Sequence, residues 1–155
     1  RFNDPWAAVR AKPPAKETAL MTDQTLFIPH FAAATTGAIV ILNVLLMILV
    51  GRQRGATKTN LGDGDPNGPL YRAIRSHGNL AENAGLVLVA LALLELLTGP
   101  TAYVQGLCGL FLVARLAHPV GLSGSIMPLR ALGALGTVVV SVGAAVLLLQ
   151  ATLFA

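Results

Sequence analysis

The chain has 155 residues, of which 54% are hydrophobic and 12% are charged, and its formal net charge is +4. Ordinary soluble domains carry about 25% charged residues, so this composition indicates a membrane protein and excludes disorder over most of the chain. The single cysteine excludes a disulfide framework and a zinc site built on cysteines, and we expect no metal site. One Trp and two Tyr provide too few stacking surfaces for bases, so we expect no nucleic-acid partner.

The polar N-terminal stretch, residues 1–20, differs in composition from everything that follows. It contains three prolines and shows no apolar periodicity, and the first methionine of the chain is Met21. We expect residues 1–20 to be a non-native or disordered extension that lies outside the fold. We expect residues 21–155 to form a single domain.

Four apolar segments follow in chain order. The hydrocarbon core of a bilayer is about 30 Å thick, which takes about 20 helical residues. Membrane-spanning helices are predicted at residues 27–50, 70–98, 102–119 and 129–155. The tight turn at residues 98–101 predicts an antiparallel hairpin of the second and third helices, while residues 51–69 and 121–128 are predicted loops. The expected fold class is an all-α membrane protein with a four-transmembrane-helix bundle.

The basic residues of this domain gather at one end of the predicted bundle. They follow the first helix, open the second and fourth helices, and close the third: Arg52, Arg54, Lys58, Arg72, Arg75, Arg115 and Arg130. The positive-inside rule places this end in the cytoplasm. Orientation alone is therefore one explanation for Arg52, Arg54 and Arg130.

A polar stripe runs along the second predicted helix. At about 100° per residue, its members share one face: Arg72, Arg75, Asn79, Glu82 and Asn83. An ionised side chain at the centre of a bilayer costs at least about 2.5 kcal/mol, so this face must contact protein, water or ligand. One interpretation is that these residues bond to one another and to neighbouring helices. The other is a site in which arginines bind carboxylates and Glu82 binds an ammonium group.

Four further residues in the predicted helices carry side chains that could have a chemical role. Arg115 and His118 are three residues apart at the end of the third helix, so they share a face. Glu95 lies near the opposite end of the bundle, where we expect it to stay hydrated at the membrane interface. Cys108 is expected to be a small apolar packing residue.

The segment RAIRSHGNLAENAGLVLVALALLELLTG resembles the second helix of the MAPEG family, the membrane-associated proteins in eicosanoid and glutathione metabolism. The family pattern of Arg, Asn and Glu falls on Arg75, Asn79 and Glu82, and LFLVARLAHPVGLSGSIMPLRALGALG resembles the later helices of bacterial-type members. This resemblance, over about residues 24–155, implies a homotrimer in a bacterial inner membrane, with glutathione bound between subunits near the cytoplasmic surface. It implies glutathione contacts at Arg75, Asn79 and Glu82, with Arg72 and Arg52 or Arg54 as further basic contacts.

The sequence also departs from the family at positions that bear on catalysis. In an ungapped alignment Gly124 stands where some members carry a thiol-activating arginine, His118 replaces a tyrosine, and Asn83 replaces the tyrosine after the motif glutamate. The catalytic residue is therefore left open, with Arg115, His118 and Arg130 as candidates.

Three functional hypotheses remain. The first is a microsomal glutathione transferase-like enzyme, a transferase or peroxidase that takes an apolar electrophile or lipid hydroperoxide from the bilayer. The second is a non-catalytic lipid- or ligand-binding membrane protein of the same fold. The third, a small proton-coupled exporter, calls for a glutamate in the first helix, and residues 27–50 contain none.

Overall fold

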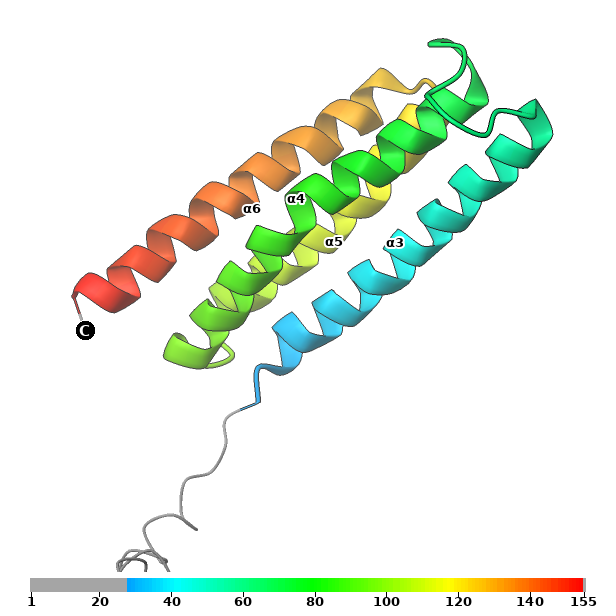
Figure 1. The fold of residues 1–155 in the computed structure, drawn as a ribbon. Coiled ribbons are helices and arrows are strands. Elements are labelled where there is room, and N and C mark those ends of the chain that lie inside the picture. The colour runs from blue at the N-terminus through cyan, green and yellow to red at the C-terminus, as the bar shows by residue number, and fades with distance from the viewer. Residues whose placement is uncertain (1–27, 155) are drawn as a thin grey trace, which may run out of the picture.

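The structure, a computed structural model, describes residues 28–154 as a bundle of four helices (Figure 1). The helices are α3 (His30–Thr57), α4 (Pro69–Thr98), α5 (Ala102–Ser123) and α6 (Met127–Leu153). All four are long and apolar enough to cross a membrane, and residues 28–154 contain no strand. The predicted all-α bundle with four spans is confirmed, whereas the expectation for residues 1–20 falls outside the described residues.

Helix α3 extends beyond the apolar segment that predicted it. Residues 51–57, expected to be part of a loop, continue the helix because Arg, Gln and Ala favour helix and no proline interrupts them. The helix ends at Lys58, which has a left-handed φ of 52° and donates its backbone N–H to the carbonyls of Arg54 and Gly55. Helix α5 likewise continues past Pro119 to Ser123, so the connecting loops are shorter than predicted.

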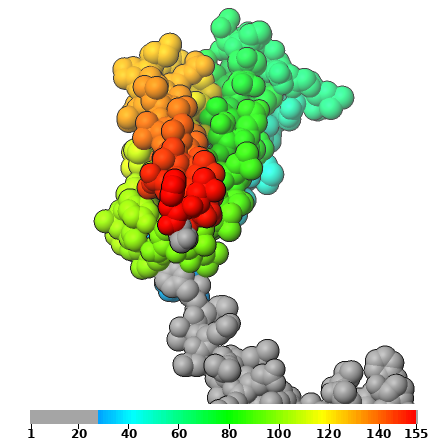
Figure 2. Space-filling model, turned by 90° about the vertical axis from the view of Figure 1, so that its left-hand side faces the viewer, coloured from blue at the N-terminus to red at the C-terminus, as the bar shows by residue number. Residues whose placement is uncertain are grey.

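Helices α4 and α5 form the middle of the bundle, and α3 and α6 lie on opposite sides of them (Figure 1). The core is apolar, with Leu91, Leu94, Val104, Phe111 and Val140 fully buried. Large apolar side chains also cover the outer faces of all four helices, as expected for surfaces in contact with lipid. Figure 2 shows the side of the bundle on which α6 lies, between parts of α4 and α5.

Helices α5 and α6 approach each other closely through glycines. A Cβ atom on Gly133 would lie 2.6 Å from the Cβ of His118 and 2.8 Å from the carbonyl oxygen of Ala114. A Cβ atom on Gly121 would overlap the backbone nitrogen of Arg130. Small residues at such crossings let two helix backbones pack directly. This packing brings His118 and Arg130 together at one end of the bundle.

Glu95 joins α4 to α3 at the opposite end. Its side chain is fully buried, and its two carboxylate oxygens accept the backbone N–H groups of Phe31 (3.1 Å) and Ala32 (2.7 Å). These amides belong to the first turn of α3, where backbone donors lack partners within the helix and the helix dipole is positive. The expectation that Glu95 stays hydrated is therefore wrong, because the α3 N-terminus replaces water as its partner.

Candidate functional site

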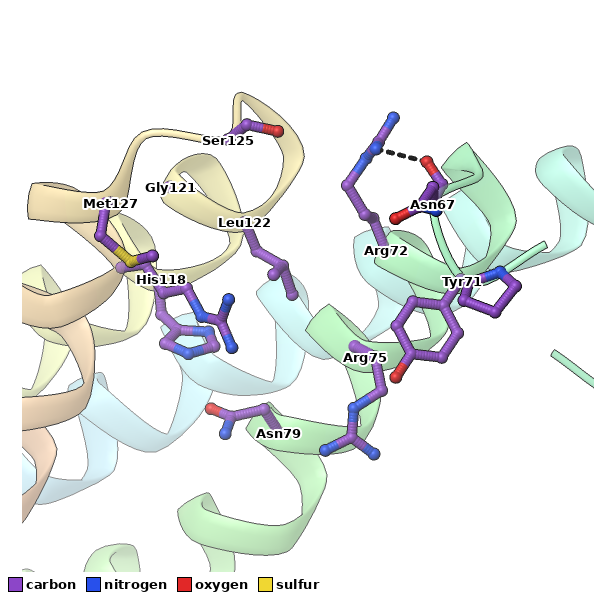
Figure 3. Close-up of a pocket in the computed structure, with 12 residues that line it drawn as sticks. Asn67, Tyr71, Arg72, Arg75, Asn79, His118, Gly121, Leu122, Ser125 and Met127 are labelled. Carbon is purple, nitrogen blue, oxygen red and sulfur yellow. Dashed lines mark hydrogen bonds between the residues drawn. The ribbon is translucent and has the colours of Figure 1, made fainter. Parts of the chain in front are cut away.

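A cavity of about 330 Å³ opens at the end of the bundle that carries the basic residues (Figure 3). Its walls come from the α3–α4 loop, the start of α4, the end of α5 and the start of α6. The lining residues are Pro66, Asn67, Tyr71, Arg72, Arg75, Asn79, His118, Gly121, Leu122, Ser125, Met127 and Arg130. Three of them are arginines and none is Asp or Glu, so the cavity favours an anionic ligand.

The structure brings together five of the residues that the sequence singled out: Arg72, Arg75, Asn79, His118 and Arg130. They come from three helices that are separated along the chain. Arg72 donates to the carbonyl of Asn67 at 2.7 Å, which fixes the edge of the loop over the cavity (Figure 3). Arg75 is exposed, and Figure 3 shows its side chain beside that of Tyr71.

Two predicted basic contacts lie elsewhere. Arg54 donates to the carbonyl oxygens of Thr59 (3.3 Å), Asn60 (3.3 Å) and Gly62 (3.1 Å), so it holds the loop that follows α3. Arg52 is exposed near the end of α3 and, like Arg54, does not line the cavity. The monomer therefore gives neither residue a direct role in this cavity.

Arg115 is buried among α4, α5 and α6 and does not line the cavity. Only 2% of its surface is exposed, and its guanidinium donates to Asn79 Oδ1 (3.1 Å), to the carbonyl of Gly133 (3.1 Å) and to Thr137 Oγ1. The guanidinium carbon also lies 5.8 Å from the centre of the Phe111 ring. Arg115 thus touches the cavity only through Asn79.

Glu82 and Asn83 are separated from the other members of the polar stripe. They line a second groove, of about 280 Å³, between α4 and α6, together with Leu86, Val87, Ala90, Ser141 and Ala145. The stripe is therefore divided between a cationic cavity at the end of the bundle and a groove further along α4. The Asn79 side chain accepts a hydrogen bond from Arg115 on another helix, while Asn83 Nδ2 donates to the Asn79 backbone carbonyl (2.8 Å) within α4.

Gly124, which aligns with the thiol-activating arginine of some family members, also lies outside the cavity. It ends α5 as its C-cap residue, and the neighbouring Ser125 lines the cavity instead. Arg130, in the first turn of α6, supplies positive charge to the same wall. Sequence reasoning missed Tyr71, Leu122 and Met127 as lining residues, since such side chains at a membrane surface carry no pattern of their own.

Comparison with known families accounts for this architecture. The family model of the MAPEG family matches residues 32–150, which include all four helices almost completely. The chain therefore belongs to the MAPEG family, and its four long apolar helices make it an integral membrane protein. Searches of curated proteins and of solved structures found no match.

Proposed function

We propose that this protein is a glutathione-dependent membrane enzyme of the microsomal glutathione transferase-like, bacterial type. The observation that carries the proposal is the cavity at the basic end, which is lined by Arg72, Arg75 and Arg130 and by no acidic residue. Glutathione bears two carboxylates and a thiol, and arginines bind carboxylates in a bidentate geometry. Family membership supports the same class of ligand.

Arg130 and His118 are the candidates for activating the thiol, because both line the cavity. Only the thiolate of a cysteine attacks electrophiles well, and a nearby cation favours the thiolate over the thiol. Arg115 does not qualify for direct contact with the thiol, since its guanidinium is buried and engaged with Asn79, Gly133 and Thr137. In our proposal Arg130 stabilises the thiolate and His118 lies next to it.

Glu82 supports an assembly of several subunits around the site. It is exposed about 20 Å along α4 from the start of that helix, beyond the reach of the cavity in one subunit. A carboxylate at such a position in a membrane needs a polar partner. We propose a homotrimer in which glutathione lies between subunits and its ammonium group meets Glu82. The second substrate, an apolar electrophile or a lipid hydroperoxide, then enters from the bilayer.

The proposed orientation follows from the distribution of charge. Arg52, Arg72, Arg75 and Arg130 all lie at one end of the bundle, which the positive-inside rule assigns to the cytoplasm. Glutathione would then reach the cavity from the cytoplasmic side of a bacterial inner membrane.

The test is a titration of glutathione into the protein in lipid nanodiscs, followed by calorimetry and by the ultraviolet absorbance of the thiolate. Saturable binding with thiolate formation supports the enzyme, and Arg75→Ala should weaken it at least tenfold, by about 1.4 kcal/mol. Gln105→Ala is the control, because Gln105 is exposed at the opposite end of the bundle and its side chain bonds only to the Pro100 carbonyl.

A non-catalytic lipid- or ligand-binding protein is the second candidate. The observation that favours it is the groove between α4 and α6, whose wall beside Glu82 and Asn83 consists mainly of apolar residues. Binding of glutathione without any thiolate absorbance, or no binding at all, would contradict the enzyme hypothesis and favour the non-catalytic binding protein.

A further inference from the structure

The side chain of Asn79 is held in one orientation by the chemistry of its neighbour. The Arg115 guanidinium lies 3.1 Å from Asn79 Oδ1. A guanidinium has N–H donors and no acceptor, so only the amide oxygen of Asn79 can face it. The assignment of oxygen and nitrogen in this amide therefore follows from its hydrogen-bond partner.

Arg115 itself is fixed from three sides. Its second terminal nitrogen donates to the Gly133 carbonyl at 3.1 Å and to Thr137 Oγ1, and the Thr137 hydroxyl donates to the same carbonyl at 2.7 Å. The Phe111 ring lies against the guanidinium, and 2% of Arg115 is exposed. If the Asn79 amide turned over, the buried guanidinium would lose its side-chain acceptor, keep only a longer bond to the Asn79 backbone carbonyl (3.5 Å), and face another donor, which is unfavourable.

The amide NH₂ of Asn79 has no hydrogen-bond partner within residues 28–154, and Asn79 lines the cavity, so the NH₂ is available to a ligand there. The cavity also presents the guanidinium groups of Arg72, Arg75 and Arg130, which can only donate. A ligand atom that meets Asn79 must consequently accept hydrogen bonds. A carboxylate satisfies this requirement and is attracted by the arginines, whereas an ammonium group can only donate and is repelled by them.

We propose that Arg115 is a positioning residue that fixes Asn79 as a hydrogen-bond donor, so that the cavity selects its ligand through a carboxylate placed at Asn79. The inference rests on the proposed function, and it deepens that function by assigning Asn79 to a carboxylate end of glutathione and leaving the ammonium group to Glu82. It also gives Arg115 a part in recognition without contact with the ligand.

Asn79→Asp is the sharpest test, because it changes no volume and keeps an acceptor for Arg115. It replaces the amide donors that face the cavity by a second carboxylate oxygen. Glutathione affinity measured by calorimetry in nanodiscs should fall by about 100-fold, while the diethyl ester of glutathione, which lacks both carboxylates, should lose much less. Unchanged glutathione affinity, or an equal loss for both probes, would overturn the assignment.

Arg115 is tested separately with Arg115→Met and Arg115→Lys. Arg115→Met frees the Asn79 amide, so the preference for glutathione over its diethyl ester should fall about tenfold. Arg115→Lys should retain part of this preference, since an ammonium group can still donate to Asn79 Oδ1. If Arg115→Met does not fold, Thr137→Val loosens Arg115 without touching Asn79 and should lower the same preference. A preference that stays unchanged in a folded variant contradicts a positioning role.

The two proposals fail differently. Absence of glutathione binding to the wild-type protein overturns the proposed function and with it the carboxylate assigned to Asn79. Wild-type binding that neither Asn79→Asp nor the Arg115 variants alter overturns the positioning role alone. Gln105→Ala serves as the control, since Gln105 is exposed at the other end of the bundle and bonds only to the Pro100 carbonyl.

Discussion

Replacement of Glu95 by alanine should loosen α3 from the rest of the bundle. The Glu95 carboxylate is fully buried and accepts the N–H groups of Phe31 at 3.1 Å and Ala32 at 2.7 Å. These two bonds tie the N-terminus of α3 to a residue near the C-terminus of α4. Between lipid-facing helices, where burial of apolar surface gives little net driving force, such polar contacts matter for the arrangement.

The magnitude follows from the two hydrogen bonds and the helix dipole. A hydrogen bond to a charged group contributes about 1.5–3 kcal/mol, and a charge at a helix N-terminus adds about 0.3–1 kcal/mol. Removing the carboxylate also removes its desolvation penalty, which offsets part of this sum. We expect Glu95→Ala to lower the free energy of unfolding by about 3 kcal/mol, and Glu95→Gln, which keeps one acceptor oxygen, by about 1–2 kcal/mol.

The assay is reversible unfolding in mixed detergent micelles, followed by circular dichroism as the fraction of denaturing detergent rises. Gln105→Ala is the control, because its Nε2 donates one bond to the Pro100 carbonyl at 3.0 Å on the surface of the same end, and it should cost less than about 1 kcal/mol. If Glu95→Ala costs no more than this control, Glu95 does not hold α3, and the reasoning from its two bonds is refuted.

Three further outcomes follow from the site and its support. Gly133→Ala should destabilise the protein by about 1–3 kcal/mol in the same assay, because its Cβ would lie 2.6 Å from the Cβ of His118. Gly143→Ala should destabilise it less, since the nearest atom to its Cβ is the flexible end of a leucine side chain at 3.3 Å. Arg130→Ala should abolish the thiolate absorbance in nanodiscs, and Arg130→Lys should retain part of it. Arg54→Ala should speed amide hydrogen exchange in the loop after α3, because it removes the hydrogen bonds to the Thr59 and Gly62 carbonyls.

The helices could be predicted from the sequence wherever their residues are apolar enough to span the bilayer. Their polar ends, which lie beyond the apolar segments, could not be predicted from hydropathy. The apolar runs gave the four spans because about 20 apolar residues are needed to cross a bilayer. Hydropathy could not show that α3 continues through residues 51–57, since polar side chains at a membrane surface are compatible with helix and with loop. The burial of Glu95 could not be predicted for a related reason, because its partners are backbone amides that no side-chain pattern reveals.

The site could be predicted only as far as one helix extends. Periodicity places Arg75, Asn79 and Glu82 on one face, but a shared face is not a shared cavity. Arg75 and Glu82 are seven residues apart, which is a rise of about 10 Å, and the cavity reaches Asn79 and not Glu82. The role of Arg115 could not be predicted, because it depends on the packing of three helices. Arg115 lies about 12 Å from the C-terminal end of α5, and from the sequence alone it resembles a basic residue near the membrane interface.

The two buried polar attachments serve different parts of the bundle. Arg115 connects α4, α5 and α6, which are the three helices that line the cavity, whereas Glu95 connects α4 to α3, and within residues 28–154 no residue of α3 lines the cavity. Energetic changes at sites without shared partners add independently. Loss of Glu95 should therefore lower stability without altering glutathione affinity, while loss of Arg115 should alter both, so the two substitutions separate the support of the fold from the support of the site.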